Sequence, residues 1–122
     1  MLESVPNFSE GRDGEVIDAL RRSLSAPARL LDVHVDGDHH RSVFTLVGEE
    51  EQLVETLLAG IACARERIDL RSHEGAHPRI GAADVVPIVP IRPEAMARAR
   101  ETATVLARRI GAELGLPVFL YG

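Results

Sequence analysis

Five histidines, all between residues 34 and 77, are the residues of this sequence best suited to proton transfer. Imidazole titrates near neutral pH, so a histidine held in a fixed direction can take up and release a proton during a reaction. His73 and His77 lie in HEGAHPRIGAADVVP, whose glycines and prolines predict a loop. His34, His39 and His40 lie in or beside RLLDVHVDGDHHR. The candidate chemistry is therefore confined to two short stretches.

His77 is the histidine whose backbone the sequence restricts most. Pro78 favours extended angles at His77, and Gly75 and Gly81 permit sharp turns on either side. Residues 69–84 form a connection of the length at which an ordered loop is usually functional. Such placement is what a general acid or base needs. From the residues alone, a loop histidine whose ring only bonds a neighbouring carbonyl is the slightly favoured interpretation.

Two spacings raise the question of a metal site. His73 and His77 are four residues apart, as zinc ligands on a helix are, but Gly75 and Pro78 disfavour a helix there. The cluster DGDHH, residues 36–40, contains oxygen and nitrogen ligand types, and a metal-dependent hydrolase is the alternative that it supports. Aspartates also favour turns for backbone reasons alone. We expect no bound metal.

Charged residues accompany both histidine stretches. Asp32, His34 and Asp36 alternate along a predicted strand and are expected on one face of it, where they suit a cationic substrate group or the orientation of a histidine. A solvated polar face is the alternative. Arg41 and Arg79 border the histidines, and guanidinium forks suit carboxylates. Their alternative is a surface ion pair worth ~0–1 kcal/mol.

Alternating and helical patterns predict the elements that position these residues. The stretches RLLDVHVD and RSVFTLVG predict a hairpin, with Leu31, Val33 and Val35 on its apolar face. In VVPIVPI, at least one of Pro87 and Pro90 must lie at a strand end or bulge. Further strands are predicted over 2–8 and 116–122. Three helices are predicted: the first begins at a cap, Ser9 or Asp13, and ends before Pro27, the second covers 49–70, and the third runs from Met96 to Gly115.

The resulting order, βαββαβαβ, matches the ferredoxin-like βαββαβ unit with an added C-terminal helix and strand. We expect an α+β sandwich in which the helices lie on one face of a mixed sheet. The other face is then available to a ligand or a second domain. At 122 residues the chain, 1–122, is predicted to be a single domain.

Composition narrows the classes of partner. The net charge is -5 and there is no basic run, so nucleic acid is not an expected partner. No apolar run approaches the ~20 residues that a membrane span needs, and no secretory signal is evident, so a membrane is not expected either. Cys63 is the single cysteine, which excludes an internal disulfide and fits a cytoplasmic protein.

Four stretches, VPNFSEGRD, LLDVHVDGDHHRSVFTLVG, HEGAHPRIGAADVVPIVP and LPVFLYG, together resemble the N-terminal subdomain of the glutamate formimidoyltransferases, folate enzymes of histidine breakdown. The pattern H-x-G-x-H-P-R-x-G-A-x-D over 73–84 is specific. The resemblance implies two related ferredoxin-like halves, with tetrahydrofolate and N-formimino-glutamate meeting in the cleft between them. The chain corresponds to the first half. His40 departs from the asparagine that is usual in the family.

By this resemblance His77 is the catalytic histidine, and tetrahydrofolate is a co-substrate in a reaction that needs no metal. It also implies a second formimidoyltransferase half, in cis or in trans, and leaves pairing of two copies open. A folate-binding or self-association module without catalysis is the alternative. The residues assigned to substrate binding are Asp32, His34, His40, Arg41, His73, Arg79 and Asp84.

Overall fold

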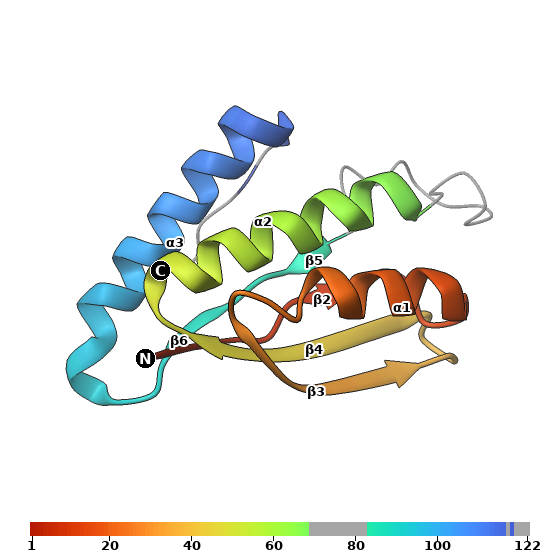
Figure 1. Ribbon diagram of the computed structural model, residues 1–122, viewed down its shortest axis with the longest axis horizontal. Helices are drawn as coiled ribbons and strands as arrows, with labels where there is room; N and C mark the ends of the chain where they lie inside the picture. Colours follow the sequence, from red (N-terminus) through yellow and green to blue (C-terminus); the bar gives the residue numbers. More distant parts are fainter. Residues whose placement is uncertain (69–82, 117, 119–122) are drawn as a thin grey trace.

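The computed structural model describes residues 1–68, 83–116 and 118, and its helices pack against an antiparallel sheet (Figure 1). The α+β class predicted from the sequence is therefore confirmed. The strands are β1 (Leu2–Ser4), β2 (Asn7–Phe8), β3 (Arg29–Asp36), β4 (Arg41–Gly48), β5 (Ala83–Val85) and β6 (Ile88–Pro90). The helices are α1 (Gly14–Ser23), α2 (Glu50–Arg67) and α3 (Met96–Arg109), with a 3-10 turn at Pro93–Ala95 and a π-helical turn at Ile110–Leu114.

The sheet has the strand order β5-β2-β4-β1-β6, and β3 pairs with β4. β1 and β2 lie along the same strand, β4, and pair in turn with β6 and β5. The predicted strands over 2–8 and 85–91 are thus each divided in two, at Pro6 and Pro87, and the two breaks are neighbours. The Ser4 hydroxyl donates to the Pro87 carbonyl at 2.7 Å. Pro90 ends β6, so the prediction that a proline lies at a strand end is confirmed.

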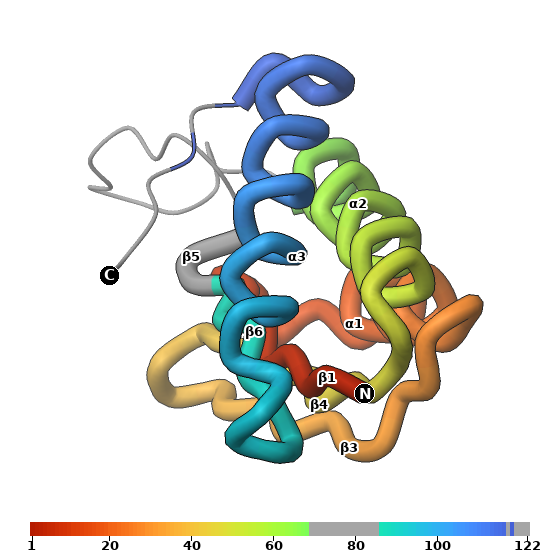
Figure 2. The backbone as a smooth tube through the Cα atoms, turned by 90° about the vertical axis from the view of Figure 1, so that its left-hand side faces the viewer, coloured from red at the N-terminus to blue at the C-terminus, as the bar shows by residue number. Residues whose placement is uncertain are grey.

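One face of the sheet, which we call the covered face, packs under α1 and α2, and the two views agree on this arrangement (Figure 2). Alternation along β4 buries Ser42, Phe44 and Leu46 and leaves the residues between them half-buried. The rings of Phe8 and Phe44 meet edge to face, with centroids 5.6 Å apart. The helices add Val16, Leu20, Leu53, Leu57 and Ile61 to this core.

The opposite face, which we call the open face, includes Asp32, His34, Val43, Thr45 and Val47. The described residues on this face are exposed or half-buried. Register along the hairpin sets His34 opposite Val43 and Asp32 opposite Thr45. The prediction that Asp32 and His34 share one face of their strand is therefore confirmed.

A bulge in β3 corrects one predicted orientation. The register between β3 and β4 shifts between Leu30 and Asp32, so Leu31 has no partner in β4. Leu30 packs against the core in its place, and Leu31 is 51% exposed. The prediction that Leu31 shares the face of Val33 was wrong because it assumed regular alternation, which one extra residue interrupts.

The helix ends follow the predicted signals. Asp13 caps α1, since its Oδ1 accepts the N–H groups of Glu15 and Val16 at 3.0 and 3.3 Å. Gly115 has a left-handed φ of 65° and stops the last helical turn, as predicted. Met96, the first residue of α3, is 47% exposed, and Thr102 is buried on that helix. The Thr102 hydroxyl donates a hydrogen bond to the Arg98 carbonyl, so Thr102 can be buried without an unpaired polar group.

Two further predictions concern the C-terminal part. Leu116 and Val118 lie in no strand, and the rest of the strand predicted over 116–122 is outside the described residues. Every pairing between the described strands is antiparallel, so that part of the chain contains no parallel pair of the predicted mixed sheet. None of the helices in the described residues combines the length and apolar character needed to cross a membrane.

Candidate functional site

One end of the sheet brings together the chain after β2, the hairpin loop between β3 and β4, and the start of β5. Phe8 pairs with Ser42 in β4 and with Ala83 in β5. Because these neighbours are antiparallel, the chain after Phe8 and the chain before Ser42 and Ala83 leave the strands at the same end. His73, His77 and Arg79 lie outside the described residues, but the connection that carries them joins the sheet at this end. The backbone of Asp84 lies in β5, and its side chain is outside the described part.

On the open face, the structure places Asp32 and His34 side by side along β3, both exposed. Arg41 begins β4 and stands opposite Asp36, also on the open face. Asp32, His34 and Asp36 therefore share one face, as predicted, and Arg41 shares it as well. Asp32 and His34 lie in the strand, whereas Arg41 lies at the end where the histidine connection arrives.

At that end, residues 9–13 pack on residues 36–41, and we call this the loop–hairpin corner. A Cβ on Gly11 would lie 2.4 Å from both the Arg41 nitrogen and the Asp36 oxygen, so only glycine fits between them. The Arg12 Nε donates to the Gly37 carbonyl at 2.9 Å. The corner is therefore held by backbone contact and hydrogen bonds.

Asp36 organises the hairpin side of the corner. Its Oδ1 accepts the N–H groups of Asp38 and His39 at 3.0 and 3.2 Å, and its Oδ2 lies 2.6 Å from the His39 Nδ1. The hydrogen bond from the His39 ring is the main reason that the pKa of Asp36 lies below its ordinary value. The carboxylate is thus engaged with its own turn, as an aspartate at the start of a hairpin loop often is.

His40 faces the other side of the corner. Its backbone is left-handed, with φ 54°, a conformation that asparagine also tolerates well. Its Nδ1 accepts the Gly11 N–H at 3.1 Å and lies 3.4 Å from the Glu10 Oε2. The ring nitrogen is therefore turned toward the loop rather than toward the His39 side chain. His39 and His40, adjacent in the sequence, have different surroundings.

Sequence reasoning missed Glu10, which is only 6% exposed. Its Oε2 accepts the N–H groups of Arg12 and Asp13 at 3.1 and 3.0 Å. The stretch SEGRD suggested only a turn, because acidic residues between turn formers are usually solvated. The available signal was the glycine that follows Glu10 in the sequence. Because Gly11 has no side chain, the hairpin can pack close to the loop and bury the Glu10 carboxylate.

A metal centre does not assemble among the residues that the structure describes. They contain no group of three or more histidine, cysteine, aspartate or glutamate residues that could hold an ion. In the DGDHH cluster, Asp36 is bonded to its own turn and His40 to the loop. The geometry of these residues therefore gives the metal-dependent hydrolase no support.

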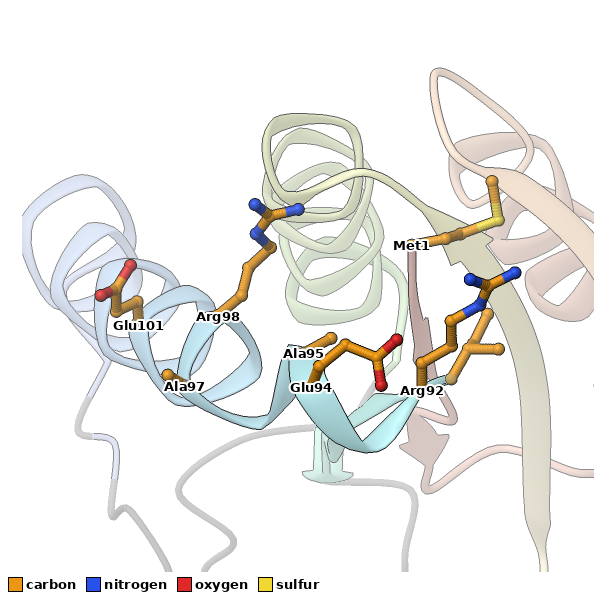
Figure 3. Close-up of a pocket in the computed structure, with 8 residues that line it drawn as sticks. Met1, Arg92, Glu94, Ala95, Ala97, Arg98 and Glu101 are labelled. Atoms are coloured by element: carbon orange, nitrogen blue, oxygen red, sulfur yellow. The ribbon is translucent and has the colours of Figure 1, made fainter.

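A surface hollow of about 470 Å³ lies at the opposite end of the sheet, between the N-terminus and the start of α3 (Figure 3). Leu2, beside it, pairs with Gly48, whereas the loop–hairpin corner lies at the Arg41 end of the same strand. The charged side chains that line the hollow are two arginines and two glutamates, so their charges balance. The hollow is lined by Met1, Ile91, Arg92, Glu94, Ala95, Ala97, Arg98 and Glu101, none of which was a candidate.

Comparison with known proteins gives a match along the whole chain. The family model of the formiminotransferase domain, N-terminal subdomain, matches residues 1–122. The chain is 44% identical to a glutamate formimidoyltransferase of Thermoplasma acidophilum and 45% identical to one of Streptococcus pyogenes, in each case over 99% of this chain and 41% of the relative. It is 45% identical to a formimidoyltransferase-cyclodeaminase of Gallus gallus, over 100% of this chain and 23% of that protein. The chain therefore spans less than half the length of these relatives.

Proposed function

The chain belongs to the family of formiminotransferase N-terminal subdomains, and from that membership we propose that it is the N-terminal half of a folate-dependent glutamate formimidoyltransferase. The proposed reaction transfers a formimino group from N-formimino-L-glutamate to tetrahydrofolate. The observation that carries the proposal is the match over the full chain, with relatives of 44 and 45% identity that bear this name. The meeting of the hairpin loop and the start of β5 at one end of the sheet supports it.

The proposed catalytic residue is His77. In this reaction the attacking folate nitrogen loses a proton and the departing glutamate amine gains one. A single imidazole can act first as general base and then as general acid, because its charged and neutral forms are both accessible near neutral pH. The entry of the His77 connection beside the loop–hairpin corner supports a site at that end.

Substrate binding is proposed for residues on the open face and around the corner. Arg41 and Arg79 would bind substrate carboxylates through their guanidinium forks. Asp32 and His34 offer polar contacts on the same face as Arg41. His40, His73 and Asp84 complete the proposed set.

We further propose the ferredoxin-like arrangement for this half. If β1 and β2 are taken as one strand and β5 and β6 as another, the order across the sheet is fourth, first, third, second, as that unit has it. The open face would then receive the second half of the enzyme, in cis or in trans, with the substrates between the halves. Pairing of two copies and a cytoplasmic location belong to the same proposal, which requires no metal.

Replacement of His77 tests the function. We expect His77→Ala, in a protein that contains both halves, to lower kcat by on the order of 10²–10⁴ while tetrahydrofolate and N-formimino-glutamate still bind, because general acid–base catalysis contributes about that factor. The measurement is steady-state transfer with both substrates, together with substrate binding by calorimetry. His39→Ala is the matched control, since His39 is exposed and bonded only within its own turn among the described contacts.

Unchanged turnover in His77→Ala would remove His77 from the mechanism. A protein with both halves that binds folate but transfers nothing, even unaltered, would instead favour a binding module.

A further inference from the structure

The loop–hairpin corner contains a buried carboxylate that the proposed reaction does not use. Burial of a carboxylate is costly unless its oxygens are hydrogen-bonded. The Glu10 Oε2 accepts the N–H groups of Arg12 and Asp13, and both contacts lie within the loop itself. Glu10 therefore fixes the conformation of residues 9–13, and the buried side of that loop faces the hairpin.

His40 joins this loop to the hairpin. Its Nδ1 is close to both the Gly11 N–H and the Glu10 Oε2, and the contact with Gly11 has the distance and angle of a hydrogen bond. The ring hydrogen is accordingly assigned to Nε2. A left-handed backbone at a residue with a side chain persists where its surroundings fix it, and here the bond to Gly11 does so.

Arg41 is the residue that lies directly beside this contact. It follows His40 directly and begins β4 opposite Asp36. A Cβ at Gly11 would lie 2.4 Å from its nitrogen and 2.7 Å from its oxygen, so the loop rests on the backbone of Arg41 itself. Pairing with β3 and close contact with Gly11 both restrict that backbone.

From these contacts we infer that Glu10 and His40 are positioning residues for Arg41. They hold the loop–hairpin corner in one conformation and so keep the Arg41 guanidinium on the open face, ready for a substrate carboxylate. The inference rests on the proposed function, because that function gives Arg41 its ligand. It also assigns His40 an indirect role in substrate binding, through Arg41, because the His40 Nδ1 accepts the Gly11 N–H.

The test is a set of variants in the two-half protein, assayed for kcat and for the KM of N-formimino-glutamate. His40→Ala and Glu10→Ala should each raise that KM on the order of tenfold, the effect expected when a hydrogen bond to a charged group is lost, and change kcat by less than about twofold. In an Arg41→Ala background, His40→Ala should raise the KM no further, because it acts only through Arg41.

A conservative change separates positioning from general damage. His40→Asn should recover most of the KM lost in His40→Ala, since asparagine tolerates a left-handed backbone and its side-chain oxygen can accept the Gly11 N–H. His39→Ala, one residue away, should leave the KM unchanged. If His40→Ala does not fold, His40→Gly replaces it, because glycine keeps the backbone conformation and removes only the ring.

Two results would overturn the inference in distinguishable ways. If His40→Ala raises the KM by the same factor with and without Arg41, His40 acts on the fold and does not position Arg41, while the proposed function stands. If Arg41→Ala alone leaves the KM unchanged, Arg41 binds no carboxylate, and that part of the proposed function fails together with the inference.

Discussion

The covered face and the loop–hairpin corner are held by different forces. On the covered face, aromatic and aliphatic side chains such as Phe8 and Phe44 are fully buried under α1 and α2. At the corner, backbone groups meet around Gly11, and Glu10 and His40 supply hydrogen bonds. Burial of apolar surface is strong and non-directional, whereas hydrogen bonds contribute less and fix geometry. The interactions that stabilise the fold and those that position the candidate residues therefore lie largely in different regions of this molecule.

The largest expected effect lies on the covered face. Phe44→Ala should lower the free energy of unfolding of the chain by about 3–5 kcal/mol, because it empties the centre of the core. Its neighbour Val43 is half-buried on the open face, and Val43→Ala should cost less than about 1.5 kcal/mol. Urea unfolding followed by circular dichroism measures both. Similar losses for the two variants would contradict the contrast between the faces.

An intermediate effect is expected at the corner. Gly11→Ala should lower the free energy of unfolding by about 1–3 kcal/mol, because the new methyl group meets the backbone of both Arg41 and Asp36 and the loop must shift. Gly14 is the matched control: a Cβ there meets nothing within 4 Å, and the residue begins α1. Gly14→Ala should stabilise the chain by about 0.5–1 kcal/mol. A Gly11→Ala variant as stable as the unaltered chain would show that the corner is not tightly packed.

The smallest effect concerns the pH dependence of the corner. The pKa of Asp36 is below its ordinary value of 3.8, chiefly because the His39 ring hydrogen-bonds the carboxylate. A lowered pKa in the folded state means that Asp36 stabilises the fold above its ordinary value and that this contribution is lost as pH falls through the lowered pKa. Asp36→Asn removes this titration, so the free energy of unfolding of the variant should decrease less as the pH is lowered below about 3.8.

Urea midpoints as a function of pH, with an NMR titration of the Asp36 carboxyl carbon, measure this effect. His39→Ala should move the pKa of Asp36, measured as the midpoint of the NMR titration, back toward its ordinary value. A midpoint that stays in place without the His39 ring would assign the shift to the backbone N–H groups alone.

Local periodicity predicted most of the element order. The bounds of β3 and β4 and the course of α2 followed from alternating and helical spacing, and the caps at Asp13 and Gly115 from residue type. Such signals lie within a few residues of the feature they predict. The bulge at Leu31 was not predictable in this way, because one added residue looks the same as regular alternation until the partner strand is known.

The candidate site was predictable to a smaller degree. The sharing of one face by Asp32 and His34 needed only the period of a strand. The burial of Glu10 and its proximity to His40 depend on contacts 30 residues apart in the chain, which local patterns do not encode. The roles assigned to His77, Arg79, His73 and Asp84 rest on the family resemblance and remain predictions.

The bulge at Leu31 has a consequence for the behaviour of the protein in concentrated solution. Among the described strands, β3 pairs only with β4, so its outer row of N–H and C=O groups is a template for another chain. The extra residue breaks the regular spacing of that row, and Asp32 sets a charge beside the break. We therefore expect a strand of another molecule to pair with only a short part of this edge, which disfavours fibril growth.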